Sequence, residues 1–331
     1  MGIFQILVNI LCVIFFIASI IICIRSRVEI KVLEETKLDL AEKVKKQEQH
    51  IKRLERTIPI ELYEKGKIVE NGEIKNISIH EPFAIMEMNA SHFSKQVQGR
   101  SLEAVLNLSN SLLTKVIPYV YENNGLINSF KKAGFVAFYE KSCESALKAA
   151  ISISEIIEET KNSELIENFA VGLSYGMVLA GMAGTEHRNS LITVSVSADL
   201  AKFLRSIARK YSARVLITGT LKQRIEEFER KFHSRKLGYI YITETDSLEE
   251  VFDVYDGESV QTRKEKQKTK IVFEKGVDFY TKGEYEKARQ YFIEVCKTNR
   301  YDDAAKEYLK RCDENLVQPE LAKSGPQIEE F

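Results

Sequence analysis

The 331-residue sequence has little of what several common classes of protein depend on. Its five cysteines are scattered, odd in number and without a CxxC pair, so neither a disulfide framework nor a zinc site is expected, and a reducing compartment fits better. None of the five histidines stands at metal-ligand spacing. Lysine plus arginine and aspartate plus glutamate both total 48, so no charge excess points to nucleic acid as a partner.

The N-terminus of the chain carries a long apolar run. The run from Ile3 to Ile24 is apolar apart from Gln5, Asn9 and Ser19, and its length matches the ~20 residues that cross a bilayer as a helix. A cleaved signal peptide is the alternative, but it would have a basic residue before the run, and here Arg25 and Arg27 follow it. We therefore expect residues 1–27 to be a single-pass anchor in the cell membrane, and the positive flank predicts that the later domains are cytoplasmic.

The next segment, residues 28–58, has the heptad pattern of a coiled coil. The apolar a and d positions of one frame are Ile30, Leu33, Leu40, Val44, Ile51, Leu54 and Ile58. Lys37 and Gln47 interrupt this seam, which weakens it but can fix the register of two strands. A single amphipathic or solvated helix is the alternative. We expect a parallel homodimer, because a membrane would also confine both copies, and Pro59 then ends the helix.

Residues 59–77 are expected to connect this helix to a larger domain at residues 78–256, where strand and helix patterns alternate. Strands are predicted near 83–88, 126–139, 170–182, 214–218 and 239–255, and helices near 102–121, 143–159 and 198–210. Mixed elements of this length are typical of an α/β sandwich.

Three stretches of this domain carry a distinctive combination of motifs. They are Asn89-Ala-Ser-His-Phe-Ser94, the hairpin from Gly125 to Phe138, and the segment from Gly172 to Leu204 with its Gly-x-x-Gly turn at Gly181. Together they resemble the class III adenylate/guanylate cyclase catalytic domain, in the order in which that family has them. The resemblance implies an α+β sandwich of the ferredoxin-like class, and a homodimer that forms through this domain as well as through the coiled coil.

The resemblance also implies where the catalytic residues of the family stand. That chemistry needs two metal ions, Mg²⁺ or Mn²⁺, held by two aspartates, with an asparagine on the ribose and an arginine on the transferring phosphate. In this sequence Asn89 and Ala133 occupy the metal positions, Ser129 and Val196 the base-reading positions, Asp199 the ribose position and Phe203 the arginine position. Because none of these is the residue that the family uses, we expect no catalytic residues and no metal ligands.

Two charged residues near these positions are weak substitutes. Glu87 lies two residues before Asn89 on the same strand face, so it could supply one metal ligand, but exposure to solvent or an ion pair is the interpretation we favour. Arg205 lies two residues after Phe203, which turns it far around the helix from the arginine position.

Beyond this domain the sequence changes character. Residues 257–270 are polar and are expected to form a charged linker. Residues 271–315 resemble a tetratricopeptide repeat, with an ordinary helical hairpin as the alternative. The residues at the offsets of the repeat are Gly276, Phe279, Tyr285, Ala288 and Phe292. Residues 316–331 are expected to be a disordered tail, because they are rich in polar residues, proline and glycine.

These features predict a membrane-anchored, dimeric signalling protein whose cyclase-like domain is inactive and has no cofactor. Its C-terminal helices are expected to bind a protein partner. Two alternatives stay open. One is an active cyclase that makes cyclic nucleotide from ATP or GTP with unconventional ligands and with Mg²⁺ or Mn²⁺. The other is a structural membrane scaffold without any ligand.

Overall fold

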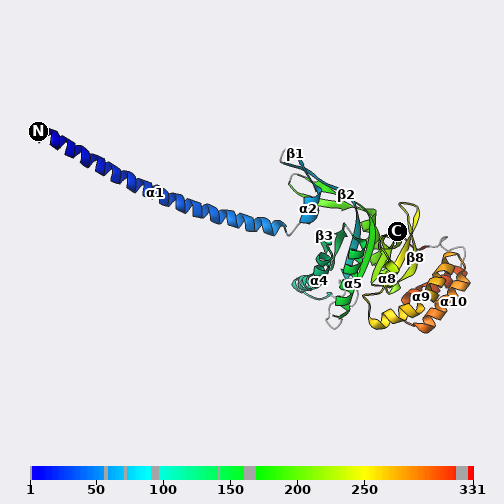
Figure 1. Ribbon diagram of the computed structural model, residues 1–331. Helices are drawn as coiled ribbons and strands as arrows, with labels where there is room; N and C mark the ends of the chain where they lie inside the picture. Colours follow the sequence, from blue (N-terminus) through cyan, green and yellow to red (C-terminus); the bar gives the residue numbers. More distant parts are fainter. Residues whose placement is uncertain are drawn as a thin grey trace. The chain divides into compact units, whose positions relative to one another are not determined.

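Figure 1 shows the protein as a computed structural model. The structure describes residues 2–55, 59–70, 73–90, 97–140, 142–159, 169–185, 187–317 and 327–331, and only the backbone of residues 3–13, 54, 67–70, 73–77 and 328. The chain divides into two units, residues 1–60 and 61–331. The first contains one long helix, and the second contains the sheet and the later helices.

The first unit is helix α1 (Gly2–Glu55), which runs for 54 residues. No proline interrupts it, and ion pairs one turn apart, such as Lys43 Nζ to Asp39 Oδ2 at 2.6 Å, support its surface. The apolar seam residues whose side chains the structure describes are all exposed, namely Ile30, Leu33, Leu40, Val44 and Ile51. An exposed apolar stripe of this kind is stabilised when another helix covers it.

The expected membrane anchor at Ile3 to Ile24 falls within α1. The side chains of residues 3–13, about half of that run, lie outside the described residues. Among the residues that the structure describes, no helix is long and apolar enough to cross a bilayer. The anchor therefore stays a prediction from the sequence.

The second unit is built on a mixed sheet of ten strands. The strands are β1 (Lys67–Glu70), β2 (Glu73–Ala90), β3 (Leu126–Lys131), β4 (Gly134–Tyr139), β5 (Phe169–Gly184), β6 (Asn189–Val194), β7 (Val215–Thr218), β8 (Ser234–Ile242), β9 (Ser247–Val254) and β10 (Gln327–Glu330). Their spatial order is β10-β8-β9-β7-β5-β2-β4-β3, with β1 paired to β2 and β6 paired to β5. The pairs β5–β7 and β8–β10 are parallel, and the others are antiparallel.

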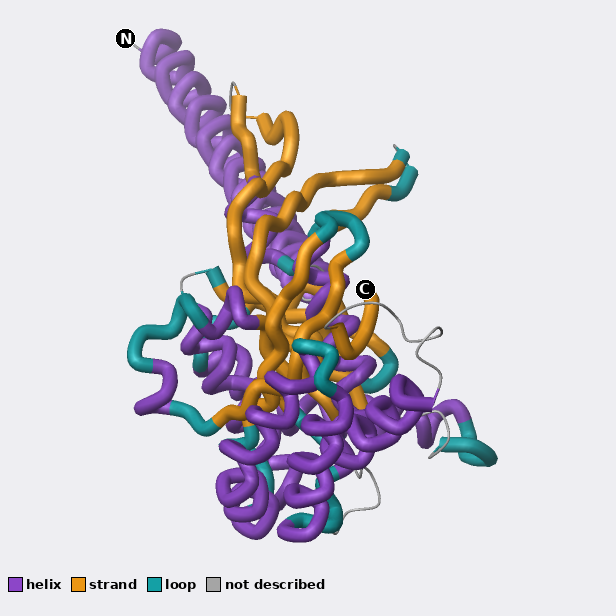
Figure 2. Tube along the Cα trace, turned by 90° about the vertical axis from the view of Figure 1, so that its right-hand side faces the viewer, coloured by secondary structure: helices purple, strands orange, loops and turns teal. Residues whose placement is uncertain are grey.

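Helices pack against both faces of this sheet, as the turned view in Figure 2 shows. The helices are α2 (Ile60–Gly66), α4 (Leu102–Glu122), α5 (Cys143–Glu159), α6 (Val196–Ala208), α7 (Gly219–Lys222) and α8 (Phe228–Lys231). Alternate residues of β2 enter different cores. Met86 joins the cluster that contains Leu147 of α5, whereas Ile85 joins the cluster that contains Ala201 of α6. The mixed α/β architecture expected from the sequence is confirmed.

Three further helices follow the sheet, α9 (Val260–Thr281), α10 (Tyr285–Thr298) and α11 (Asp303–Val317). The linker expected at 257–270 is wrong, because α9 already begins at Val260, where the Ser259 hydroxyl accepts a hydrogen bond from the Thr262 amide. Gly276 lets α9 approach α10 closely, since a Cβ at this position would lie 2.9 Å from the Phe292 ring. Membership of the tetratricopeptide family stays a prediction.

The C-terminal helices share a core with the sheet. One buried cluster contains Leu237 and Ile240 of β8 together with Phe273 of α9, Phe292 of α10 and Tyr308 of α11. The Tyr308 hydroxyl donates a hydrogen bond to the Leu237 carbonyl at 2.5 Å. Figure 1 shows α9 and α10 (yellow to orange) on the β8 side of the sheet. The helices are therefore an integral layer of this unit.

A buried group of charges lies where these helices meet the sheet. Arg235 of β8 is fully buried, with its Nε 3.0 Å from Asp253 Oδ2 and its Nη1 2.5 Å from Asp302 Oδ2. Lys266 Nζ of α9 lies 2.9 Å from Asp253 Oδ2 and 2.7 Å from Glu258 Oε1. Two cations thus face three carboxylates away from water, and burial raises the pKa of Glu258.

The tail expected to be disordered at 316–331 is wrong in both of its described parts. Helix α11 continues to Val317, and Gln327 to Glu330 form β10 at the edge of the sheet. Residues 318–326 lie outside the described residues.

Candidate functional site

The two positions expected to hold metal meet at the end of β2. Asn89 stands opposite Gly134 of β4, and the Ala90 amide donates to the Ala133 carbonyl at 2.8 Å. Gly134 permits this approach, because a Cβ there would lie 2.0 Å from the Met88 carbonyl oxygen. The turn of the β3–β4 hairpin is therefore held against β2, which brings together the positions of Asn89 and Ala133.

Neither of these positions offers a ligand of the kind that the family uses. Asn89 is half-buried and neutral, and Ala133 is buried with a methyl group that coordinates nothing. Across the described residues, no group of three or more His, Cys, Asp or Glu side chains could hold a metal ion. Hard divalent cations prefer carboxylate oxygens. The residues present at these two positions therefore do not fit Mg²⁺ or Mn²⁺.

The nearby carboxylate of Glu87 is committed to an ion pair. Its side chain is only 3% exposed, and Oε1 lies 2.7 Å from Nζ of Lys131 and 3.3 Å from Nη2 of Arg205. Of the two interpretations that the sequence left for Glu87 apart from metal binding, exposure is wrong and the ion pair is confirmed. A metal ion at Glu87 would have to enter beside two cations, which repel it.

Glycine and strand register together explain why these three side chains meet. Glu87 is opposite Gly172 of β5, and a Cβ on Gly172 would lie 2.7 Å from the backbone nitrogen of Arg205. Helix α6 therefore lies directly on β5 beside Glu87, within reach of the Arg205 side chain. Lys131 reaches the same carboxylate from the end of β3, where it pairs with Gly134.

Sequence reasoning missed Lys131 and the contact of Arg205 with Glu87. The signal for Lys131 was its place at the end of the β3–β4 hairpin, next to the strand that carries Glu87. The signal for Arg205 was Gly172, since a glycine in a buried strand often marks a close approach of another backbone. The two-residue offset on α6 was enough to predict that Phe203 and Arg205 point in different directions. It could not predict which residue Arg205 contacts.

The remaining expected pocket residues do not converge on this carboxylate. Ser129 and Asp199 are exposed, and Val196 at the start of α6 is 43% exposed. Phe203 is half-buried, and its ring centroid lies 5.3 Å from that of Phe331, after the C-terminal strand. The residue at the arginine position therefore packs against the end of the chain.

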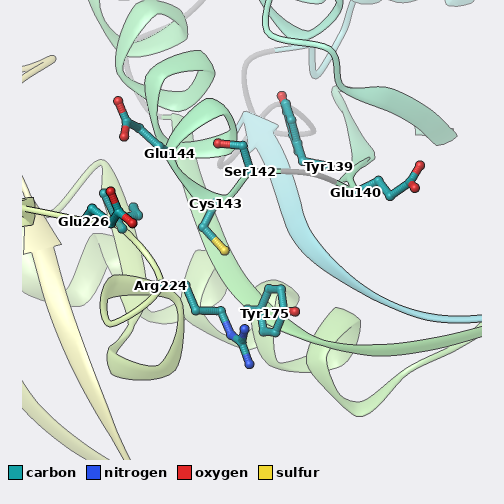
Figure 3. A pocket seen from close by; sticks show the side chains of 9 residues that line it. Tyr139, Glu140, Ser142, Cys143, Glu144, Tyr175, Arg224 and Glu226 are labelled. Carbon is teal, nitrogen blue, oxygen red and sulfur yellow. The ribbon is translucent and has the colours of Figure 1, made fainter.

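A separate cavity of about 310 Å³ lies between the start of α5, β5 and the segment after α7. Its side chains are shown in Figure 3, where the Tyr139 hydroxyl points away from Cys143 and Arg224. Burial raises the pKa of the Cys143 thiol to about 11, so this thiol is protonated at neutral pH and is a poor nucleophile. The guanidinium of Arg224 lies 3.8 Å from the centre of the Tyr175 ring. The expected site residues do not line this cavity.

Comparison with known proteins supports the fold that the sheet and its helices show. No protein-family model matches the chain. Its sequence is similar to a terminal-differentiation-specific adenylate cyclase from Dictyostelium discoideum, at 24% identity over 238 residues, which cover 69% of this chain and 11% of that protein. Two structures of a bacterial light-regulated adenylyl cyclase match it with a TM-score of 0.55, at 16% and 17% identity. The fold is that of an adenylyl cyclase.

This result confirms the resemblance to the class III cyclases at the level of the fold and of a distant sequence relationship. The chain spans about a tenth of the curated relative's length, and the two solved chains are covered to 63% and 64%, with 66% of this chain matched. The activity named for those proteins is theirs, and the loss of catalytic residues in this chain stays a prediction.

Proposed function

We propose that this protein is a cyclase-homology signalling protein that makes no cyclic nucleotide and acts as a dimeric regulatory module. The observation that carries the proposal is the state of the expected metal site. Asn89 and Ala133 provide no carboxylate, and the buried carboxylate of Glu87 is already neutralised by Lys131 and Arg205. A two-metal mechanism depends on carboxylates that gather two dications around the phosphates. Here protein cations take the place next to the carboxylate.

Exposed apolar surfaces on both units support a homodimer. On α1 the seam residues Ile30, Leu33, Leu40, Val44 and Ile51 are each between 47% and 66% exposed. In the second unit, Leu179 of β5 stands opposite Val194 of β6, and these two side chains are 50% and 61% exposed. Apolar patches of this kind on a soluble domain commonly mark protein–protein contacts. A second copy of the chain covers both surfaces in this proposal.

The membrane and the C-terminal helices complete the proposal. The apolar run Ile3 to Ile24, followed by Arg25 and Arg27, supports a single-pass anchor with the later domains in the cytoplasm. The C-terminal helices are the surface that docks a protein partner. Because these helices share a core with β8, a partner that binds them and shifts them also shifts the sheet.

A turnover assay tests the central claim. The full-length chain in mild detergent is incubated with ATP or GTP and with Mg²⁺ or Mn²⁺, beside an active cyclase as positive control. We expect no cyclic product above the no-protein control. Metal-dependent product that disappears in Glu87→Gln or Asp199→Asn would establish the active alternative. Nucleotide binding measured on the same sample separates a nucleotide-binding module from a scaffold that has no ligand.

A further inference from the structure

The C-terminal strand β10 lies along the outer edge of β8, and the C label beside β8 in Figure 1 marks its end. The Phe331 amide donates to the Tyr241 carbonyl at 2.8 Å, and the Thr243 amide donates to the Phe331 carbonyl at 2.9 Å. The Thr243 hydroxyl donates to the same carbonyl at 2.8 Å. The strand therefore uses edge groups of β8 that would otherwise face solvent.

The side chain of Glu329 is the most specifically held part of this strand. Its Oε1 accepts hydrogen bonds from Lys210 Nζ at 2.7 Å, from the Tyr211 hydroxyl at 2.8 Å and from Arg311 Nη2 at 2.9 Å. Burial alone would raise the pKa of Glu329, but these donors hold it below its ordinary value. Lys210 and Tyr211 follow α6, whereas Arg311 comes from α11. We call these three side chains the Glu329 cradle.

The cradle does not depend on Glu329 for all of its charge balance. Glu307 lies 3.1 Å from Lys210 Nζ and 3.0 Å from Arg311 Nε. Without β10 the two cations of the cradle, Lys210 and Arg311, would be paired only with the carboxylate of Glu307, which leaves one positive charge without a counterpart. A groove built in this way stays partly neutralised when β10 leaves, and it still attracts a carboxylate.

An aromatic contact lies next to the cradle. The Phe331 ring packs against Phe203 of α6, with the two planes tilted by 51°. The cradle and Phe203 therefore bind two side chains of β10, a carboxylate and an aromatic ring two residues later. The edge of β8 binds the backbone between them. Main-chain pairing with pockets for alternate side chains is how sheet edges bind extended peptides. β10 is only four residues long, and a short strand at the end of a chain can detach by local unfolding and leave its place to another strand.

We propose that the β8 edge, the Glu329 cradle and Phe203 form a docking groove for an extended peptide strand with a glutamate two residues before an aromatic residue. Residues 327–331 are its resident occupant, and a partner strand of the same chemistry displaces them. The proposal goes beyond the proposed function and holds whether or not the domain turns over nucleotide.

A peptide-binding experiment tests this proposal. The probe is a fluorescein-labelled peptide of residues 324–331, and binding is followed by fluorescence anisotropy. We expect the chain without residues 327–331 to bind the probe at least about tenfold more tightly than the intact chain, where the resident strand competes at high effective concentration. A probe that carries Glu329→Gln should bind about tenfold more weakly, because it loses charge-assisted hydrogen bonds.

Matched variants of α11 locate the binding groove. In the chain without 327–331, Arg311→Gln should weaken probe binding by up to about tenfold, because the probe carboxylate loses one of its charge-assisted hydrogen bonds. Lys310→Gln, next to it but paired with Glu314 at the surface, should leave binding unchanged. A folded deletion variant that fails to bind the probe would overturn the proposal, and so would equal binding by the intact and shortened chains. If the deletion variant does not fold, the intact chain with Glu329→Gln replaces it. That variant should bind the wild-type probe more tightly than the unaltered chain, and unchanged binding overturns the proposal.

Discussion

Oε1 of Glu87 lies 2.7 Å from Nζ of Lys131, and the two side chains differ greatly in their access to water, at 3% and 33% exposed. If the pair is broken, Lys131 can turn into solvent, but Glu87 cannot. The carboxylate of Glu87 therefore loses more stabilising free energy than the ammonium group of Lys131 when the ion pair is broken. This asymmetry determines which substitution lowers the stability of the fold more.

Lys131→Met should destabilise the protein more than Glu87→Gln. The first leaves a buried carboxylate with Arg205 as its remaining cation and should cost about 2 kcal/mol, whereas the second leaves cations that reach water and should cost about 1 kcal/mol or less. Urea unfolding measures both, with Lys202→Met on the exposed face of α6 as the control. Equal costs, or a larger cost for Glu87→Gln, would contradict the asymmetry.

Asp302→Asn should be among the most destabilising conservative substitutions in the chain. It removes one of the two carboxylates that neutralise the fully buried Arg235, and the loss should be about 3 kcal/mol. The neighbouring Asp303→Asn changes a side chain that is 51% exposed and should cost less than about 1 kcal/mol. Thermal unfolding of the two variants side by side checks the difference. Similar melting temperatures would show that Arg235 does not need Asp302.

Glu258→Gln should stabilise the protein at neutral pH. Burial is the main reason why the pKa of Glu258 is raised; Lys266 opposes the shift and Asp253 adds to it. A carboxyl with a raised pKa in the folded state destabilises the fold when it is ionised, and this cost disappears as the pH falls through the raised pKa toward the ordinary value of about 4.3.

The gain from Glu258→Gln should therefore be largest near pH 7 to 8 and shrink as the solution is acidified. Urea unfolding at several pH values measures the trend. The exposed Glu294 of α10 provides the control substitution, Glu294→Gln, which should change the stability by less than about 0.5 kcal/mol. A gain that grows on acidification would have the wrong sign for this account.

Deletion of residues 271–315 should unfold the sheet domain as well as remove the helices. It would expose Leu237 and Ile240, which are buried against Phe273 and Phe292, and it would remove Asp302 from Arg235. Circular dichroism and size-exclusion chromatography should show loss of structure or aggregation. A deletion variant with a cooperative thermal transition near that of the intact chain would show that the helices are dispensable.

Leu40→Cys should form a disulfide-linked dimer under mild oxidation, because it stands in the exposed seam of α1. The experiment uses a background in which Cys12 and Cys23 are replaced by serine. Glu42→Cys lies on the opposite side of the heptad frame and should give little linked product. Equal linkage at both positions would indicate random collision, and no linkage at Leu40 would contradict a parallel coiled coil.

The sequence was sufficient for the architecture because strands and helices in the sheet domain carry clear periodic patterns. The mostly apolar stretch from Phe83 to Met88 predicted a strand that the structure extends from Glu73 to Ala90. The hairpin from Gly125 to Phe138 was also predicted, and its register places Ala133 beside Ala90. Local patterns of this kind depend on neighbouring residues, so a single sequence records them well.

The errors fall where distant residues decide the structure. The segment 257–270 was interpreted as a linker because it is highly charged. Yet Lys266 within it is buried and forms ion pairs with Asp253 and Glu258. The tail was interpreted as disordered because its composition is polar, yet Glu329 is held by Lys210, Tyr211 and Arg311. No composition rule contains these pairings, because the partners lie 8 to 119 residues away.

Arg235 also gives a way to recognise this architecture in other sequences. A fully buried arginine is tolerable only where carboxylates accompany it, and Asp302 reaches it from the start of α11. A chain with the same sheet but without the three C-terminal helices would leave the guanidinium exposed to solvent, with only Asp253 beside it. In such relatives nothing requires an arginine at the position of Arg235. The identity of the residue at that one position in β8 would then reveal whether a protein carries the helical layer.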